Sequence, residues 1–307
     1  MNRCLVIWMM IQSSIAAIAQ IPNVSSGSIR HFENFPSRYV AARNVDVWLP
    51  DGYSATKKYA VLYMHDGKSL FDSSIVWNHQ EWGVDEVLGK LMAENKIKDC
   101  IVVGAWNTEL TRHNEYLPQK PYESLRRDQQ QVLLKAKRVG GNDVFSVDEI
   151  RSDDYLRFLV QELKPYIDSA FSTLPDQQHT FISGSSMGGL ISIYAICEYP
   201  GVFGGAACLS THWTGIFRKE NNPFPGAMIN YLGKNLPSPE NHKIYFDHGT
   251  ETIDSLYRSY QLRVDRKMKS RGFNKMNWVT KEYPGADHSE RSWNKRLEIP
   301  MNFLLKK

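Results

Sequence analysis

The most informative feature of this 307-residue chain is the sequence Gly184-Ser185-Ser186-Met187-Gly188. It matches the pattern Gly-x-Ser-x-Gly, which places a serine on a tight turn between a strand and a helix, with its hydroxyl above the sheet. The flanking residues fit that context, because 179–183 predict a short buried strand and 190–196 predict an apolar helix. Only Ser186 stands at the centre of the pattern, so it is the candidate nucleophile.

Hydrophobic runs alternate with amphipathic segments along the rest of the chain. The runs that predict strands are 39–40 leading into 45–49, then 59–64, 99–105, 205–209, 243–246 and 278–283. The segments that predict helices are 84–91, 153–171, 255–270 and 289–305, with Pro165 and Pro300 as expected breaks. This alternation predicts a mostly parallel sheet with helices on both faces. We expect one domain over 20–307, with the polar stretch 109–147 as an insertion beside the site.

Composition excludes several classes of protein. Hydrophobic residues make up 42% and charged residues 23% of the chain, which is enough for one large core. A net charge of +4 is too small to indicate a nucleic-acid partner. Cys100, Cys197 and Cys208 lie in apolar patterns and predict buried free thiols. No Cys/His spacing resembles a zinc site, and we expect neither a metal nor an organic cofactor.

The first 19 residues have the pattern of a secretory signal peptide. Arg3 supplies the positive charge, and 4–11 form an apolar segment that is too short to span a bilayer as a helix. Ala17-Ile18-Ala19 fits the small-x-small cleavage rule, so we expect the mature protein to begin at Gln20. An uncleaved anchor is the alternative. The pattern predicts a secreted or periplasmic protein without stable membrane insertion after cleavage.

A reactive serine needs a base to take its proton and an acid to orient that base. His288 is the candidate base, because its Gly- and Pro-rich loop follows the last predicted strand. His212 comes too early for the order serine, acid, histidine, and His248 lies within the acid loop itself. The candidate acids lie in the loop 247–254, with Asp254 preferred, Glu251 as the alternative and Asp247 third.

Two further groups of residues are expected around the serine. Backbone N–H groups that would hold a developing oxyanion are those of Met187 and of Gly67 or Lys68, which follow an earlier strand. Aromatic and basic residues near strand ends would line a substrate pocket, although core positions are the alternative for the aromatic ones. These candidates are Trp106, Arg112, Tyr116 and Trp213.

Together these motifs resemble the esterase family that includes esterase D, enterochelin esterases, feruloyl and acetylxylan esterases, and mycolyltransferases. The resemblance runs from about residue 27 onward. It rests on the motifs Leu49-Pro50-Asp51-Gly52-Tyr53, His65-Asp66-Gly67, 112–118, 162–167, 184–189, 247–254 and 285–290 with Trp293. It implies an α/β-hydrolase fold and ester hydrolysis through an acyl-enzyme. Some relatives carry the acid two residues after Gly-Thr, where this chain has Thr252, which leaves Asp254 or Glu251.

The expected substrate is an ester met outside the cytoplasm. Removal of acetyl or feruloyl-type groups from polysaccharides or oligosaccharides is the favoured reaction. The alternatives are a siderophore trilactone esterase of the enterochelin type, an acyltransferase of the mycolyltransferase type, and a non-catalytic binding protein. Lys68 and Arg112 would attract an anionic catecholate unless carboxylates pair with them.

Overall fold

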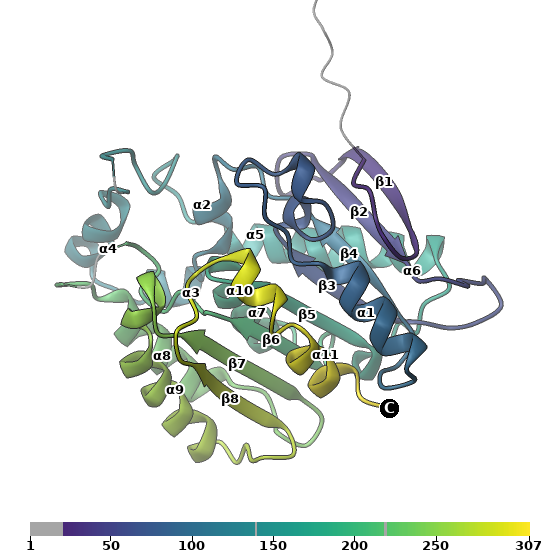
Figure 1. The fold of residues 1–307 in the computed structure, drawn as a ribbon. Coiled ribbons are helices and arrows are strands. Elements are labelled where there is room, and N and C mark those ends of the chain that lie inside the picture. Colours follow the sequence, from purple (N-terminus) through teal and green to yellow (C-terminus); the bar gives the residue numbers. More distant parts are fainter. Residues whose placement is uncertain (1–20, 139, 218–219) are drawn as a thin grey trace, which may run out of the picture.

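The computed structural model describes residues 21–138, 140–217 and 220–307. The predicted signal peptide, 1–19, lies outside these ranges. Eight strands form one sheet in the order β1-β2-β4-β3-β5-β6-β7-β8 (Figure 1). The strands are β1 (Ser28–Phe35), β2 (Arg43–Leu49), β3 (Ala60–His65), β4 (Cys100–Ala105), β5 (Thr180–Ser185), β6 (Gly205–Leu209), β7 (Lys243–Gly249) and β8 (Trp278–Tyr283). The six strands β3 to β8 run parallel, while β2 pairs antiparallel with both β1 and β4.

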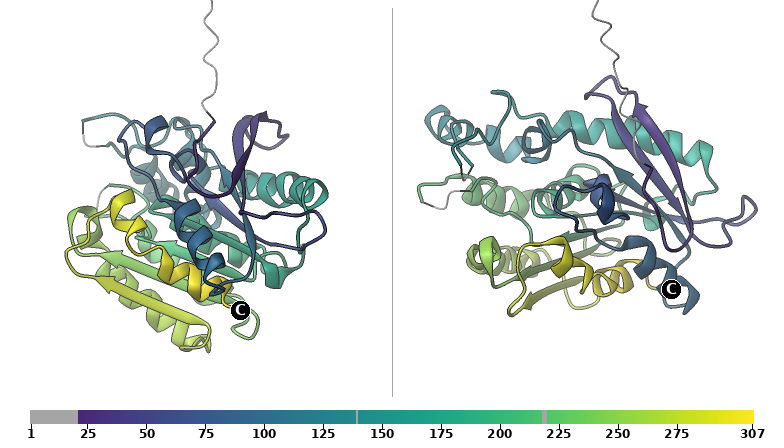
Figure 2. Two further views of the ribbon diagram at one scale, coloured as in Figure 1. Left: turned by 45° about the vertical axis from the view of Figure 1, so that its right-hand side comes forward. Right: turned by 45° about the horizontal axis from the view of Figure 1, so that its top comes forward.

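Helices cover both faces of this sheet, as the alternation in the sequence predicts. They are α1 (Val84–Ala93), α2 (Arg112–Tyr116), α3 (Gln119–Glu123), α4 (Arg127–Leu134), α5 (Ser152–Arg157), α6 (Lys164–Ala170), α7 (Met187–Glu198), α8 (Phe224–Asn235), α9 (Arg258–Ser270), α10 (Glu290–Asn294) and α11 (Glu298–Leu305). One core packs under α1, α10 and α11, and the larger one packs under α5 to α9. Figures 1 and 2 show α1 and α11 side by side on one face.

Neither Pro165 nor Pro300 breaks its helix in the predicted way. A π-helical turn, η3 (Phe158–Leu163), joins α5 to α6, and the N–H of Lys164 donates to Leu159 O. This wider turn accommodates Pro165, which stands in the first turn of α6 and lacks an N–H, so the helix continues without a break. Pro300 also lies in the first turn of its helix, α11, where proline is tolerated, and a turn at 295–297 separates α10 from α11 instead.

Other predictions can be compared directly. The segment 39–40 is not a strand, and β1 lies earlier in the chain. The expected insertion contains the short helices α2, α3 and α4, which lie with α10 around the carboxyl edge of the sheet (Figure 1). The three cysteines are buried and free, which confirms that prediction. Within the described ranges, every helix is too short or too polar to cross a membrane.

Candidate active site

Ser186 stands on a strained turn between β5 and α7. Its backbone has φ 57° and ψ −119°, values that a non-glycine residue rarely adopts. A Cβ on Gly184 would lie 2.8 Å from the backbone carbon of Gly188, so the two glycines let the turn close. The Ser186 N–H donates to Leu209 O over 2.9 Å, which fixes the turn against β6. The sequence pattern therefore has the elbow geometry that it predicts.

Asp254 and His288 form a close acid–base pair. The distance from His288 Nδ1 to Asp254 Oδ1 is 2.5 Å, and the Asp254 side chain has no exposed surface. The other carboxylate oxygen accepts hydrogen bonds of 2.6 Å from both Gly249 N and the Ser210 hydroxyl. Burial raises the pKa of Asp254, but the bonds from His288 and these donors outweigh it and hold the pKa below its usual value. Asp254 is thus kept ionised beside the imidazole.

The two other candidate acids lie elsewhere. Glu251 is exposed, and its carboxylate accepts a hydrogen bond from the hydroxyl of Thr250. Asp247 is buried and forms a 3.0 Å ion pair with Arg296. Thr252, at the position where some relatives carry the acid, instead accepts a 3.0 Å hydrogen bond from His288 N through its hydroxyl. Of the three acids, the structure joins Asp254 to His288.

The rival histidines are buried and engaged in other contacts. Burial lowers the pKa of His212 to about 3, and its Nδ1 lies 2.5 Å from Tyr257 Oη. The backbone N–H of His212 donates to Ser186 O over 3.1 Å, so this residue supports the elbow through its main chain. His248 Nδ1 lies 2.8 Å from Gly249 O. His288 remains the candidate base.

The candidate nucleophile and the candidate base both lie at the carboxyl edge of the sheet. Ser186 follows β5, Asp254 follows β7 and His288 follows β8, and these strands run parallel with β6 between β5 and β7. Sites on such sheets form at this edge. No hydrogen bond joins the Ser186 hydroxyl to His288 within the described ranges. Such bonds are often long without substrate and tighten when it binds.

The predicted oxyanion donors lie on two adjacent segments. Met187 begins α7, while Gly67 and Lys68 begin the short 3-10 helix η1 (Gly67–Ser69). The two segments are in contact, because a Cβ on Gly188 would lie 3.3 Å from His65 Cβ and 3.4 Å from Asp66 Oδ2. Within the described ranges, none of these three backbone N–H groups donates a hydrogen bond to the protein. They are free to bind an oxygen atom of a substrate.

Arg112 clamps the residue before the predicted oxyanion donors. Its Nε and Nη2 donate to the two Asp66 carboxylate oxygens over 2.7 Å each, and Asn107 adds a third bond of 2.7 Å. Asp66 has φ 58°, so these contacts hold a left-handed residue in place. The prediction of Arg112 as a substrate-binding residue is revised, because its guanidinium is already paired with a carboxylate.

Two of the three aromatic residues that were expected to line a substrate pocket lie in the hydrophobic core. Tyr116 and Trp213 have 0% and 1% exposed surface, so neither lines an open pocket, and both predictions are corrected. Both find internal partners, because the Tyr116 hydroxyl accepts from Asp66 N and the Trp213 indole donates to Gln261. Trp106 is half-buried and donates to Asp46 over 2.5 Å. Lys68 is partly exposed, 5.9 Å from the Trp106 ring centre and 3.6 Å from a Glu109 oxygen.

Two residues near the site were not predicted from the sequence. Trp77 is 86% exposed on the loop between β3 and α1. Its neighbour Asn78 donates to Glu290 Oε2 over 3.1 Å, which attaches this loop to α10, two residues beyond His288. Ser210, which contacts Asp254, is fully buried. A tryptophan beside Asn78 in a polar loop was a usable signal for Trp77, whereas nothing in the local pattern distinguishes Ser210.

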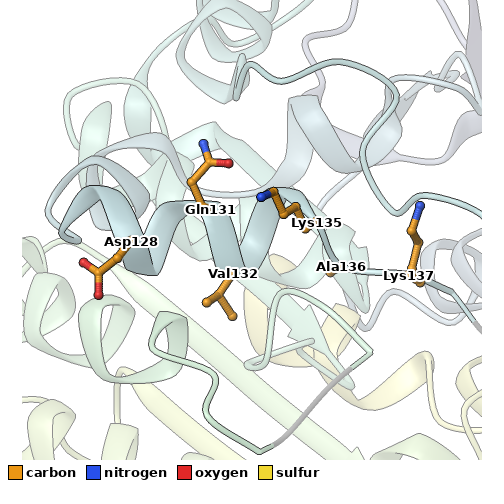
Figure 3. A pocket seen from close by; sticks show the side chains of 6 residues that line it. All are labelled: Asp128, Gln131, Val132, Lys135, Ala136 and Lys137. Carbon is orange, nitrogen blue, oxygen red and sulfur yellow. The ribbon is translucent and has the colours of Figure 1, made fainter.

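A hollow along α4 is not lined by any of the candidate catalytic residues. Its volume is about 510 Å³, and it is lined by Asp128, Gln131, Val132, Lys135, Ala136 and Lys137 (Figure 3). In the picture these side chains, which come from α4 and the segment that follows it, point in different directions and do not converge on a common centre. No group of three or more metal-ligating side chains gathers in the ranges that the structure describes.

Comparison with known proteins identifies a family of similar chains. The model of a family described as "Putative esterase" matches residues 38–300. The uncharacterized protein YbbA of Bacillus subtilis is 25% identical over 173 residues, 56% of this chain and 58% of YbbA, so the chain spans about three fifths of that relative. A ferulic acid esterase structure has a TM-score of 0.61 at 17% identity and covers 91% of this chain and 98% of its own.

The enterobactin esterase of Shigella flexneri has the same fold. Its structure gives a TM-score of 0.62 at 15% identity and covers 92% of this chain and 60% of its own. At such identities the likeness concerns the fold alone. Together with the eight-stranded sheet, it confirms the predicted α/β-hydrolase architecture.

Proposed function

The chain belongs to this esterase family, and on that premise we propose that it is a secreted serine ester hydrolase that acts through an acyl-enzyme. The observation that carries the proposal is the 2.5 Å pair of His288 and buried Asp254 on the same sheet edge as the strained Ser186 turn. The secretory pattern of residues 1–19 supports export to the periplasm or beyond.

The proposed reaction has two steps that mirror each other. His288 takes the hydroxyl proton of Ser186, whose oxygen bonds to the ester carbonyl carbon, and the N–H groups of Met187 and of Gly67 or Lys68 hold the oxyanion. The carbon–oxygen bond to the alcohol then breaks, and His288 gives the alcohol its proton. A water, deprotonated by His288, adds to the acyl carbon. The acid leaves, and Ser186 regains its proton.

We favour acetyl or feruloyl-type groups on polysaccharides or oligosaccharides as substrates. The exposed indole of Trp77 supports this choice, because its loop is attached to α10 two residues beyond His288, and an aromatic face suits the flat face of a sugar ring. The likeness to a ferulic acid esterase points the same way. A siderophore trilactone esterase is the second candidate, on the likeness to an enterobactin esterase, but Arg112 is engaged by Asp66 and Lys68 is the cation left near the site.

Hydrolysis of p-nitrophenyl acetate by the purified protein, beside Ser186→Ala, tests the reaction. We expect turnover that Ser186→Ala reduces by several orders of magnitude. Equal rates in both proteins would refute the proposal. A panel of a feruloyl ester, an acetylated oligosaccharide and a siderophore trilactone then ranks the substrates, and added sugar acceptor reveals any acyl transfer. A protein that binds these esters without turnover would instead be the binding protein.

A further inference from the structure

The turn after β6 contacts the proposed nucleophile and the proposed acid at the same time. Leu209 O and His212 N bond to the backbone of Ser186 on either side of this turn, over 2.9 and 3.1 Å. Between them, the Ser210 hydroxyl donates to Asp254 Oδ2 over 2.6 Å. One short segment therefore sets the spacing between the nucleophile's backbone and the carboxylate that orients the base.

The direction of the Ser210 hydroxyl is fixed by its other neighbours. Trp293 Nε1 and Arg296 Nη2 each donate to Ser210 Oγ over 2.9 Å. Both groups are donors only, and a hydroxyl has a single proton. The proton of Ser210 must therefore point to Asp254. The side chain has no rotational freedom left, because it is fully buried and all of its partners are protein atoms.

A buried ion pair supports the same turn from behind. Arg296 forms a 3.0 Å ion pair with Asp247, and both side chains are nearly or fully buried. Asp247 also accepts a 3.1 Å hydrogen bond from the backbone N–H of Ser210. Ser210 thus lies between two buried carboxylates, one bonded to its main chain and one to its side chain. Its φ of 42° is left-handed, a strained conformation that these contacts hold in place.

We propose that Ser210 is a positioning residue, which fixes the carboxylate of Asp254 and through it the imidazole of His288 relative to Ser186. This inference rests on the proposed function. It explains why a buried serine occupies a position where glycine would be unstrained: the hydroxyl is required. Ser210 touches no substrate in this account and acts only through Asp254.

Ser210→Gly tests the role, because glycine accepts the left-handed backbone and removes only the side chain. Loss of a hydrogen bond to a buried carboxylate predicts a fall in kcat of roughly 10- to 100-fold, with KM changed by less than about twofold. Ser172→Gly is the matched control, since Ser172 is buried at the opposite edge of the sheet and donates to Ala55 O over 3.0 Å. Its kcat should stay at the wild-type value.

A double-mutant cycle separates positioning from general damage. In an Asp254→Asn background, Ser210→Gly should lower kcat by less than about threefold, because the residue acts through that carboxylate. A full fall in that background would overturn the inference, as would a wild-type kcat in Ser210→Gly alone. If the glycine variant does not fold, Ser210→Cys keeps the volume with a weak donor, and its kcat must fall too. A wild type without Ser186-dependent hydrolysis overturns both the function and this role, whereas an active wild type with unchanged Ser210→Gly overturns this role alone.

Discussion

Replacing Asp254 by asparagine should reverse the tautomer of His288. In the wild type, Oδ2 accepts from Gly249 N and the Ser210 hydroxyl, while Oδ1 accepts from His288 Nδ1. An asparagine must place its oxygen where Oδ2 was, because the two groups there are both donors. Its NH₂ group then faces His288 Nδ1 and donates to it, so the imidazole proton moves to Nε2. Nε2 can no longer take the proton of Ser186.

The size of the loss in activity follows because Asp254→Asn removes His288 as a base but leaves the positions of the side chains unchanged. We expect kcat to fall by about 10⁴-fold, which corresponds to about 5 kcal/mol of transition-state stabilisation. Stability should change less than activity, because both bonds to the former Oδ2 position survive. The assay is p-nitrophenyl acetate hydrolysis at neutral pH, with Glu251→Gln as the isosteric control, since the Glu251 side chain is exposed and its carboxylate is bonded to the Thr250 hydroxyl. A fall of less than tenfold in Asp254→Asn, or a larger fall in Glu251→Gln, would refute this reasoning.

Three other expectations can be measured directly. Gly184→Ala should lower the free energy of unfolding in urea by about 1–3 kcal/mol, because its Cβ would collide with the backbone of Gly188, whereas Gly226→Ala on α8, where a Cβ has no neighbour, should lower it by nothing. Equal unfolding free energies in the two variants would contradict close packing inside the elbow. Trp77→Ala should raise KM about tenfold for an acetylated oligosaccharide and leave KM for p-nitrophenyl acetate unchanged, and Met276→Ala, at another exposed hydrophobic residue, is the control. An unchanged KM for the oligosaccharide would show that Trp77 does not bind the substrate. The pKa of Asp254 is depressed in the fold, so its ionised form stabilises the protein above about pH 4, and this contribution is lost as pH falls through the lower folded pKa. The difference in unfolding free energy between wild type and Asp254→Asn should therefore narrow as the pH falls below about 4, and a difference that stays constant there would argue against it.

Local patterns were enough to predict the parallel part of the fold and the elbow. Buried parallel strands are continuous apolar runs, and a glycine at 184 is required by close backbone contacts inside the turn itself. β1 was missed because a register shift between Phe32 and Phe35 interrupts its alternation of side chains. The π-helical turn before Pro165 was also missed. A proline within a helical pattern predicts a disturbed helix, but it does not say whether the helix kinks, ends or widens into a π-helical turn.

The side-chain environments of the site could be predicted only in part. His288 followed from its loop after the last strand, and its partnership with Asp254 rather than Glu251 depends on the 3-10 turn η5 (Thr252–Leu256), which points Asp254 inward. Tyr116 and Trp213 follow strand ends, but a position at a strand end does not say whether an aromatic ring faces solvent or core. Ser210 acts through contacts with residues up to 86 positions away, which no local pattern contains.

Labelling with a fluorophosphonate, followed by peptide mass spectrometry, shows whether Ser186 is an activated nucleophile. Such a probe bonds covalently to a serine only when a base activates its hydroxyl. We expect one label per molecule, on Ser186, which is lost in Ser186→Ala and forms much more slowly in Asp254→Asn. Absence of the label from Ser186, or a label on another residue, would contradict the claim that this turn carries the nucleophile.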